Sequence, residues 1–87
     1  MGKKKMSNKQ EEKGIRKEEF FTKRIRNGLA YMEDEILPFT GIFIFRYGNG
    51  AVKEYEPFVK GIKEGVNEKF YKTGNIKESN TFVDGSL

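Results

Sequence analysis

The last 47 residues of this chain contain one pattern written twice. Residues 41–63 align with residues 65–87 without a gap, at a constant offset of 24 positions, and 8 of the 23 aligned residues are identical. The identical pairs are Gly41 and Gly65, Tyr47 and Tyr71, Gly50 and Gly74, Lys53 and Lys77, Glu54 and Glu78, Phe58 and Phe82, Val59 and Val83, and Gly61 and Gly85. A fixed period of roughly 20–50 residues is typical of repeat proteins, in which each unit buries its apolar surface against a neighbour.

The composition excludes several kinds of chemistry. At 87 residues the chain has room for one small domain with a limited core. It has no cysteine, which excludes disulfides and thiolate metal sites, and no histidine, the commonest general base and metal ligand. Catalysis would need a carboxylate pair, a lysine or an activated hydroxyl, and no motif places such groups in a pocket. We therefore predict a non-catalytic protein without a metal or other cofactor.

The net charge of +4 is unevenly distributed. Residues 1–26 hold ten Lys or Arg and four Glu, a charge of +6. Residues 27–87 hold seven Lys or Arg and nine Asp or Glu, a charge of −2. Because the excess of positive charge lies in the N-terminal segment, the repeats are not expected to present a basic face to nucleic acid.

Residues 1–18 are polar and densely charged, which predicts a basic, disordered and flexible tail. One interpretation is a solubilising arm. The other is attraction to anionic lipid, RNA or an acidic partner, for which the candidate residues are Lys3, Lys4, Lys5 and Lys9. No apolar stretch of signal-peptide length follows the basic start, and the longest apolar run, residues 42–45, is too short to cross a bilayer, so we expect a cytoplasmic protein.

Residues 19–40 are expected to form a lead hairpin and an acidic loop. Two β-compatible stretches, residues 20–26 and 29–32, flank Asn27-Gly28, the pair preferred in two-residue type I′ turns. The competing interpretation is a helix that packs Phe21 and Ile25 on one face and ends at Gly28. The acidic loop, residues 33–35, lacks the alternating spacing of a calcium loop, so it predicts no metal site.

Each repeat, 41–64 and 65–87, is expected to form a strand, a glycine turn and a second strand. The first strand, residues 41–47, is apolar on both faces, which predicts a central strand covered on both sides. The lead hairpin is the expected cover, through the apolar residues Phe20, Phe21, Ile25, Leu29 and Tyr31. The second repeat is expected to be the more exposed end of an all-β meander.

The order of residues within each unit is tyrosine, two residues, glycine, two residues, Lys-Glu, three residues, Phe-Val, one residue, glycine. This order resembles the MORN repeat, and it is more similar to the bacterial MORN-variant repeats. The matching segments are Tyr47-Gly48-Asn49-Gly50 with Lys53-Glu54, Tyr71-Lys72-Thr73-Gly74 with Lys77-Glu78, and Val83-Asp84-Gly85. The resemblance covers about residues 26–87. The chain departs from the family pattern in lacking tryptophan and in carrying Thr73 where the turn asparagine is expected.

The resemblance implies antiparallel hairpins in one extended sheet and a protein-interaction role. Because bacterial members are associated with toxin–antitoxin modules, it implies an antitoxin-like module that binds a protein, such as a toxin, through its sheet face or edge. An edge strand also permits a homodimer. Eukaryotic MORN proteins imply the alternative of a peripheral module at an anionic membrane, binding phospholipid through the basic tail and an aromatic strip. A third interpretation is a structural domain whose working part lies on another chain.

Four aromatic residues are candidates for partner contact, namely Tyr47, Tyr71, Phe45 and Phe70. The two tyrosines occupy equivalent positions, which suits either packing across the sheet or a binding strip. Phe45 suits the core as well as a binding surface. The repeated Lys-Glu pairs, at residues 53–54 and 77–78, are expected to be solvated and to pair across the hairpins.

Overall fold

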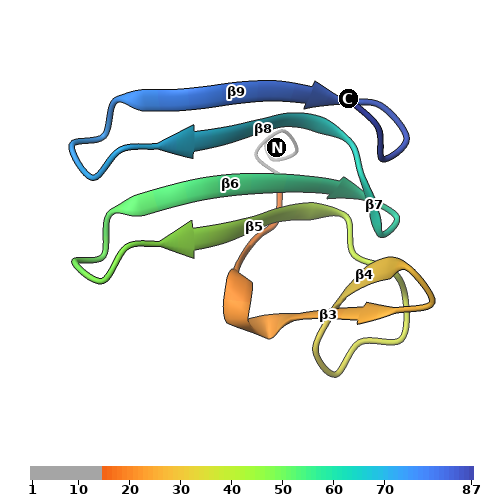
Figure 1. Ribbon diagram of the computed structural model, residues 1–87. Helices are drawn as coiled ribbons and strands as arrows, with labels where there is room; N and C mark the ends of the chain where they lie inside the picture. The colour runs from red at the N-terminus through yellow and green to blue at the C-terminus, as the bar shows by residue number, and fades with distance from the viewer. Residues whose placement is uncertain (1–14) are drawn as a thin grey trace, which may run out of the picture.

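The computed structural model describes residues 15–87, and apart from one turn of 3-10 helix their regular elements are all β-strands. The all-β prediction is therefore confirmed for this part of the chain (Figure 1). In chain order the elements are β2 (Lys17–Glu19), the 3-10 helix η2 (Phe20–Thr22), β3 (Lys23–Arg26), β4 (Leu29–Met32), β5 (Gly41–Arg46), β6 (Val52–Val59), β7 (Ile62–Lys63), β8 (Gly65–Phe70) and β9 (Ile76–Phe82).

Two sheets contain these strands. The larger has the order β2-β5-β6-β8-β9, with the short β7 paired to β6, and the smaller consists of β3 and β4. The pair β2–β5 is parallel and the other pairs are antiparallel. Figure 1 shows the β5–β6 and β8–β9 hairpins one above the other, with the β3–β4 hairpin beside β5.

The contacts of the β5–β6 hairpin recur in the β8–β9 hairpin at the offset of 24 residues. The Tyr47 amide donates to the Ala51 carbonyl at 2.9 Å, and the Tyr71 amide donates to the Asn75 carbonyl at 2.9 Å. The strand register also shifts at the same position in each hairpin, after Phe45 and after Lys69. Paired backbone conformations follow the repeat as well: Gly50 and Gly74 (φ 91° and 98°), Lys60 and Asp84 (49° and 50°), and Gly61 and Gly85 (82° and 89°).

The lead hairpin forms as predicted, and the helical interpretation is wrong. Asn27 and Gly28 have φ values of 51° and 79°, the two positive values that a type I′ turn requires. The first strand is shorter than expected, because residues 20–22 form the 3-10 helix instead. The hydroxyl of the buried Thr22 donates to the Glu19 carbonyl at 2.8 Å, which stabilises this turn over an extended chain.

The predicted tail boundary at residue 18 needs correction. Lys17 and Glu18 belong to β2, which pairs in parallel with β5, and the Ile42 amide donates to the Arg16 carbonyl at 2.8 Å. Pairing occurs because the amides on this side of β5 face away from β6 and need acceptors. The remaining tail prediction concerns residues 1–14, which lie outside the described part of the chain, and so do the four candidate tail lysines.

The core lies between β5 and the lead segment. Phe43 is fully buried, stacks on Phe39 with 4.2 Å between ring centroids, and meets Phe58 edge to face at 5.9 Å. The predicted burial of the first-repeat strand is confirmed by Phe43 and by Ile44, which is 8% exposed. Ala30, on β4, completes this cluster.

The residues that cover β5 differ in part from those predicted. Phe21 and Ile25 are mostly exposed and make no cover. Phe20 does cover β5, because its ring stacks on the Phe45 ring with 5.0 Å between centroids. Ile25 lies opposite Ala30, but β4 is the strand of the hairpin that packs against the core, so Ala30 is buried and Ile25 stays exposed.

A buried carboxylate also fixes the lead hairpin to the sheet. Glu56, on β6, is 9% exposed and forms ion pairs with two lysines. The Lys23 ammonium lies 2.9 Å from one carboxylate oxygen and the Lys63 ammonium lies 3.2 Å from the other. Lys23 begins β3 and Lys63 ends β7, so one side chain joins three elements.

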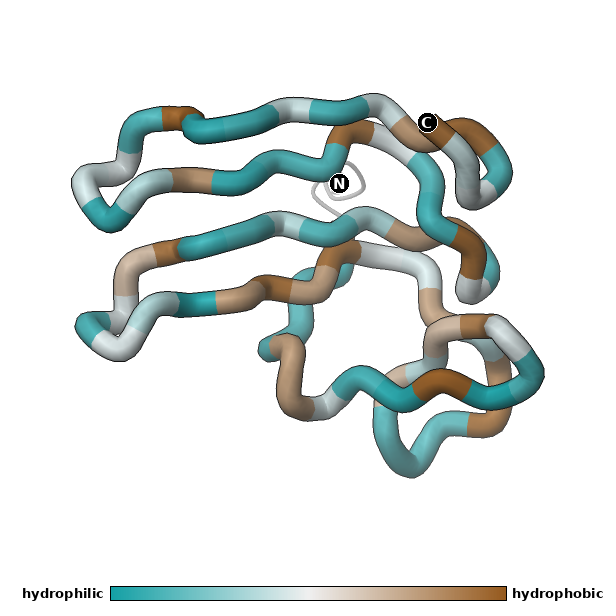
Figure 2. Tube along the Cα trace, viewed as in Figure 1, coloured by the Kyte–Doolittle hydropathy of each residue, from teal (hydrophilic) through white to brown (hydrophobic). Residues whose placement is uncertain are grey.

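The cover does not extend over the second repeat. Figure 2 shows mostly hydrophobic colour along β5 and mostly hydrophilic colour along β8 and β9. Equivalent glycines show the same difference. A methyl group added to Gly61 would meet Leu29 Cβ at 2.9 Å, whereas one added to Gly85 would meet nothing nearer than Ile62 at 3.6 Å. The second hairpin is thus the exposed end, as predicted. Within the described residues, no helix is long and apolar enough to cross a membrane.

Candidate functional site

Three surface hollows mark the places where a ligand or partner side chain fits. One of about 550 Å³ lies between the β3–β4 hairpin and the acidic loop. An apolar groove of about 320 Å³ lies along the ends of β5 and β6, beside Ile15. The third, of about 260 Å³, lies at the end of the sheet that carries the 47–51 and 71–75 turns.

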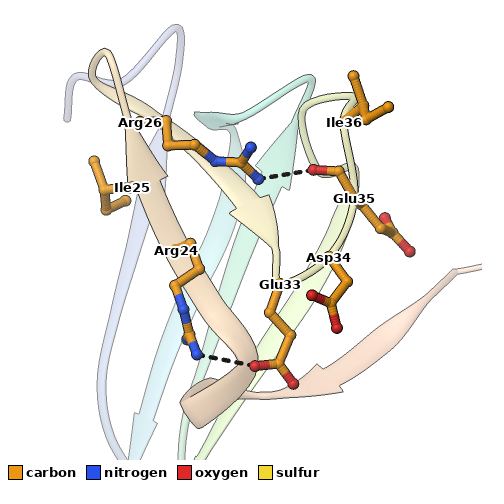
Figure 3. Close-up of a pocket in the computed structure, with 7 residues that line it drawn as sticks. All are labelled: Arg24, Ile25, Arg26, Glu33, Asp34, Glu35 and Ile36. Atoms are coloured by element: carbon orange, nitrogen blue, oxygen red, sulfur yellow. Dashed lines mark hydrogen bonds and ion pairs between the residues drawn. The ribbon is translucent and has the colours of Figure 1, made fainter.

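The first hollow is a structural feature, because arginines bind two of its three acidic residues, Glu33 and Glu35 (Figure 3). Arg24 donates to the Glu33 carboxylate at 2.9 Å, and Arg26 donates to the Glu35 carbonyl at 2.7 Å. The Glu35 carboxylate accepts two hydrogen bonds from Arg16, at 2.9 Å and 2.6 Å. Within residues 15–87, no group of three or more acidic, histidine or cysteine side chains is arranged to hold a metal ion.

The Arg16–Glu35 pair makes a testable contribution to stability at low pH. Hydrogen bonds from Arg16 lower the pKa of Glu35, so its contribution is present above the ordinary glutamate pKa and is lost as the pH falls through the lowered value. We expect Glu35→Gln to lower the melting temperature slightly at pH 7 and to lower it less near pH 3. Thermal melts at both pH values measure this, and an equal deficit at both would show that the ionised carboxylate is not the cause.

The structure brings two of the four predicted partner-contact residues together in the third hollow. The Tyr47 hydroxyl donates to the Phe70 carbonyl at 2.7 Å, which joins the two hairpins, and both residues line the hollow. The equivalent Tyr71 lies in the outer turn and is half exposed. Tyr47 therefore contacts the backbone of β8, and the aromatic pairs of the described residues do not include a Tyr47–Tyr71 pair.

The other two predicted contact residues have neighbours of their own. Phe45 stacks on Phe20 and packs against the core, so it belongs to the covered part of the sheet. The Phe70 ring meets the Tyr55 ring edge to face, with 5.6 Å between centroids. Of the predicted set, Tyr47, Phe70 and Tyr71 surround the turn end, and Phe45 does not.

Sequence reasoning missed the lysines that surround these aromatic rings. The Lys53 and Lys72 ammonium groups lie 5.8 Å and 5.7 Å from the Tyr47 ring centroid, and Lys77 lies 5.9 Å from that of Tyr71. The Lys53–Tyr47 and Lys77–Tyr71 contacts are equivalent at the offset of 24 residues. The repeat itself carried this signal, because both members of each pair are among its identical positions.

The predicted lysine–glutamate pairs across the hairpins do not form. Glu54 instead accepts a hydrogen bond from the Asn67 amide group at 2.9 Å, and Glu78 accepts one from the Asn80 amide group at 2.7 Å. Both asparagines lie further along the strands, away from the turns. The carboxylates are thereby hydrogen-bonded to asparagines, and within residues 15–87 the lysines at the turn end form no ion pair.

Comparison of the chain with protein-family models, with curated proteins and with solved structures finds no match.

Proposed function

We propose that this chain is a non-catalytic, MORN-like repeat module that recognises a protein partner, in an antitoxin-like role, through the β8–β9 hairpin and its outer edge. One observation supports this proposal above the others. The lead segment covers the first hairpin, while the second hairpin repeats the same backbone without a cover.

The outer edge of β9 supports strand addition. In the first repeat, the corresponding edge of β6 pairs with the next hairpin, with Glu54 opposite Lys69 and Tyr55 opposite Glu68. β9 has the equivalent backbone, and within residues 15–87 no strand pairs with its outer edge. Unpaired amides and carbonyls along such an edge can bind an extended segment of another chain.

Apolar side chains beside this edge supply contact area. Four apolar residues of the second repeat are each about half exposed, which is more than a covered sheet would leave: Val66 (48%), Tyr71 (50%), Ile76 (57%) and Val83 (60%). Side chains of this kind at the rim of a free edge give a partner strand apolar contacts beyond its backbone hydrogen bonds.

Thr81→Pro is expected to block the edge without disrupting the sheet. Its repeat equivalent is Pro57, which the first hairpin accommodates opposite Ile42. The Ile42 amide donates to the Arg16 carbonyl, on the side of β5 that faces away from β6. The Ile42–Pro57 pair therefore has no backbone hydrogen bond that a proline would remove. Thr81 lies opposite Val66 in the same register, so its amide points outward. Proline there removes one donor from the free edge and none from the β8–β9 ladder.

The test is affinity capture from host lysate with quantitative mass spectrometry. Wild type and the control Thr81→Ala, which keeps the amide, are expected to retain one stoichiometric protein. Thr81→Pro is expected to retain about tenfold less, the effect of losing one well-formed edge contact. Equal retention by Thr81→Pro would show that the edge is not used. If wild type retains no stoichiometric protein, the proposed function is wrong.

A further inference from the structure

We propose that the partner recognised by this module also presents an extended acidic peptide, separate from the strand that pairs with β9, which lies across the lysines of the third hollow, called here the turn-end hollow. This inference rests on the proposed function and specifies the chemistry of the partner. We call Lys53, Lys69 and Lys77 the lysine row. All three line the hollow together with Tyr47, Phe70 and one acidic residue, Glu54.

The lysine row crosses three neighbouring strands. Lys69, on β8, lies opposite Glu54 of β6 and opposite Glu78 of β9. Lys53 and Lys77 immediately precede those glutamates, at the register shifts that both hairpins share. Because neighbouring strands are about 4.8 Å apart, the row spans about 10 Å from β6 to β9. Lys72 adds a fourth ammonium group against the Tyr47 ring.

The positive charges of the row are not neutralised by the described residues. The two glutamates that alternate with them bind asparagines, and in the described part of the chain none of the four lysines forms an ion pair. Lys69 lies directly opposite two glutamates, whereas Lys53 and Lys77 fall at the register shifts and have no residue opposite them. The hollow therefore holds more positive than negative charge, and an anionic segment that lies across it meets complementary charge.

The spacing of the row favours an extended peptide. An extended chain in the polyproline II conformation has three residues per turn and advances about 3.1 Å per residue, so carboxylates at every third position share one face about 9 Å apart, close to the span of the row. The aromatic walls offer apolar contact to the residues between them. An anionic membrane surface fits less well, because a plane of lipid headgroups would also meet Glu78, which lies opposite Lys69 but outside the hollow, whereas a single segment in the hollow meets Glu54 as its one glutamate.

Two double variants with the same change in charge test the row. Lys53→Gln with Lys77→Gln alters the row, and Lys17→Gln with Lys60→Gln alters two exposed lysines outside it. The probe is a fluorescein-labelled peptide of about ten residues with glutamate at every third position, and its glutamine analogue is the reference. Fluorescence anisotropy measures binding to the full chain at two salt concentrations.

Wild type is expected to bind the glutamate peptide in preference to the glutamine peptide, and more weakly at higher salt. The row variant is expected to lose about tenfold in affinity and the control variant less than about twofold. Lys53→Arg with Lys77→Arg is expected to retain binding, which shows that a loss in the row variant reflects charge and not misfolding.

Several results would overturn the inference. They are equal binding of the two peptides, equal losses in the two double variants, or row-dependent binding to phosphatidylserine vesicles without binding to the glutamate peptide. If one of these results is obtained while a lysate partner still depends on the β9 edge, the proposed function stands and only the acidic-peptide inference is removed. The absence of any lysate partner would remove the proposed function, whatever the peptide result.

Discussion

Phe43→Ala is expected to destabilise the protein by about 3–5 kcal/mol, the usual cost of truncating a buried phenylalanine. Phe43 has no exposed surface and contacts the rings of Phe39 and Phe58, which together hold the lead segment on the sheet. A chain of this length has a total stability of roughly 4–13 kcal/mol, so the variant should lose between about a quarter of that stability and all of it.

The matched control for this variant is Phe21→Ala. Phe21 is 65% exposed, so its truncation should change stability by less than about 1 kcal/mol. Urea unfolding followed by far-UV circular dichroism measures both variants. Equal midpoints for Phe43→Ala and wild type would mean that the cluster around Phe43 is not the core of the protein.

Gly41→Ala is expected to be the second most damaging change, at about 2–4 kcal/mol, because strain and overpacking add. Gly41 has a φ of 151°, which side chains rarely adopt. Its added Cβ would also lie 2.5 Å from the Arg16 carbonyl oxygen and 2.8 Å from Phe39 Cζ. Arg16 immediately precedes β2, and Phe39 belongs to the core. Neither atom can therefore move without disturbing the residues that pack against β5.

The repeat provides a control for this variant at its equivalent position. Gly65 has a φ of 109°, and an added Cβ would meet only Pro57, at 3.6 Å. Gly65→Ala should therefore cost only the backbone strain, about 1 kcal/mol. Thermal melts of the two variants compare them directly. A cost for Gly65→Ala as large as that for Gly41→Ala would contradict the conclusion that only the first repeat is covered.

The sequence predicted the elements whose signals are local. Asn27-Gly28 indicated a type I′ turn because both positions need positive φ, and the offset of 24 residues predicted the equivalent turns of the two hairpins. The register shifts that the two hairpins share were not predicted. The continuous apolar run at residues 42–45 predicted the buried central strand, since alternation is absent only where both faces are covered.

The features that the sequence did not predict depend on contacts between distant segments. β2 is short and charged, and it forms because the outer edge of β5 offers it hydrogen bonds. Phe39, at the core, lies in a segment that reads as a loop after Pro38. Ile25 and Ala30 lie opposite each other and so project from the same face of the lead hairpin, and only its packing against the sheet decides that Ala30 is buried while Ile25 stays exposed.

The candidate site was predicted only in outline. The repeat placed Tyr47 and Tyr71 at equivalent turns, but it did not show that the Tyr47 hydroxyl is used by the Phe70 carbonyl. The lysines beside these rings were interpreted as partners of the adjacent glutamates. That interpretation failed because Asn67 and Asn80 donate hydrogen bonds to these carboxylates instead. The equivalent positions of the first repeat hold Phe43 and Glu56, so the first repeat gave no sign of these bonds.

The most direct test of the account is hydrogen–deuterium exchange of the protein with and without the partner captured from lysate. Without partner, amides of β5 and β6 should exchange more slowly than those on the outer side of β9, because only the first hairpin is covered. With partner, we expect added protection in residues 71–83. Added protection confined to the β3–β4 hairpin, or none at all, would contradict the claim that the uncovered second repeat is the binding surface.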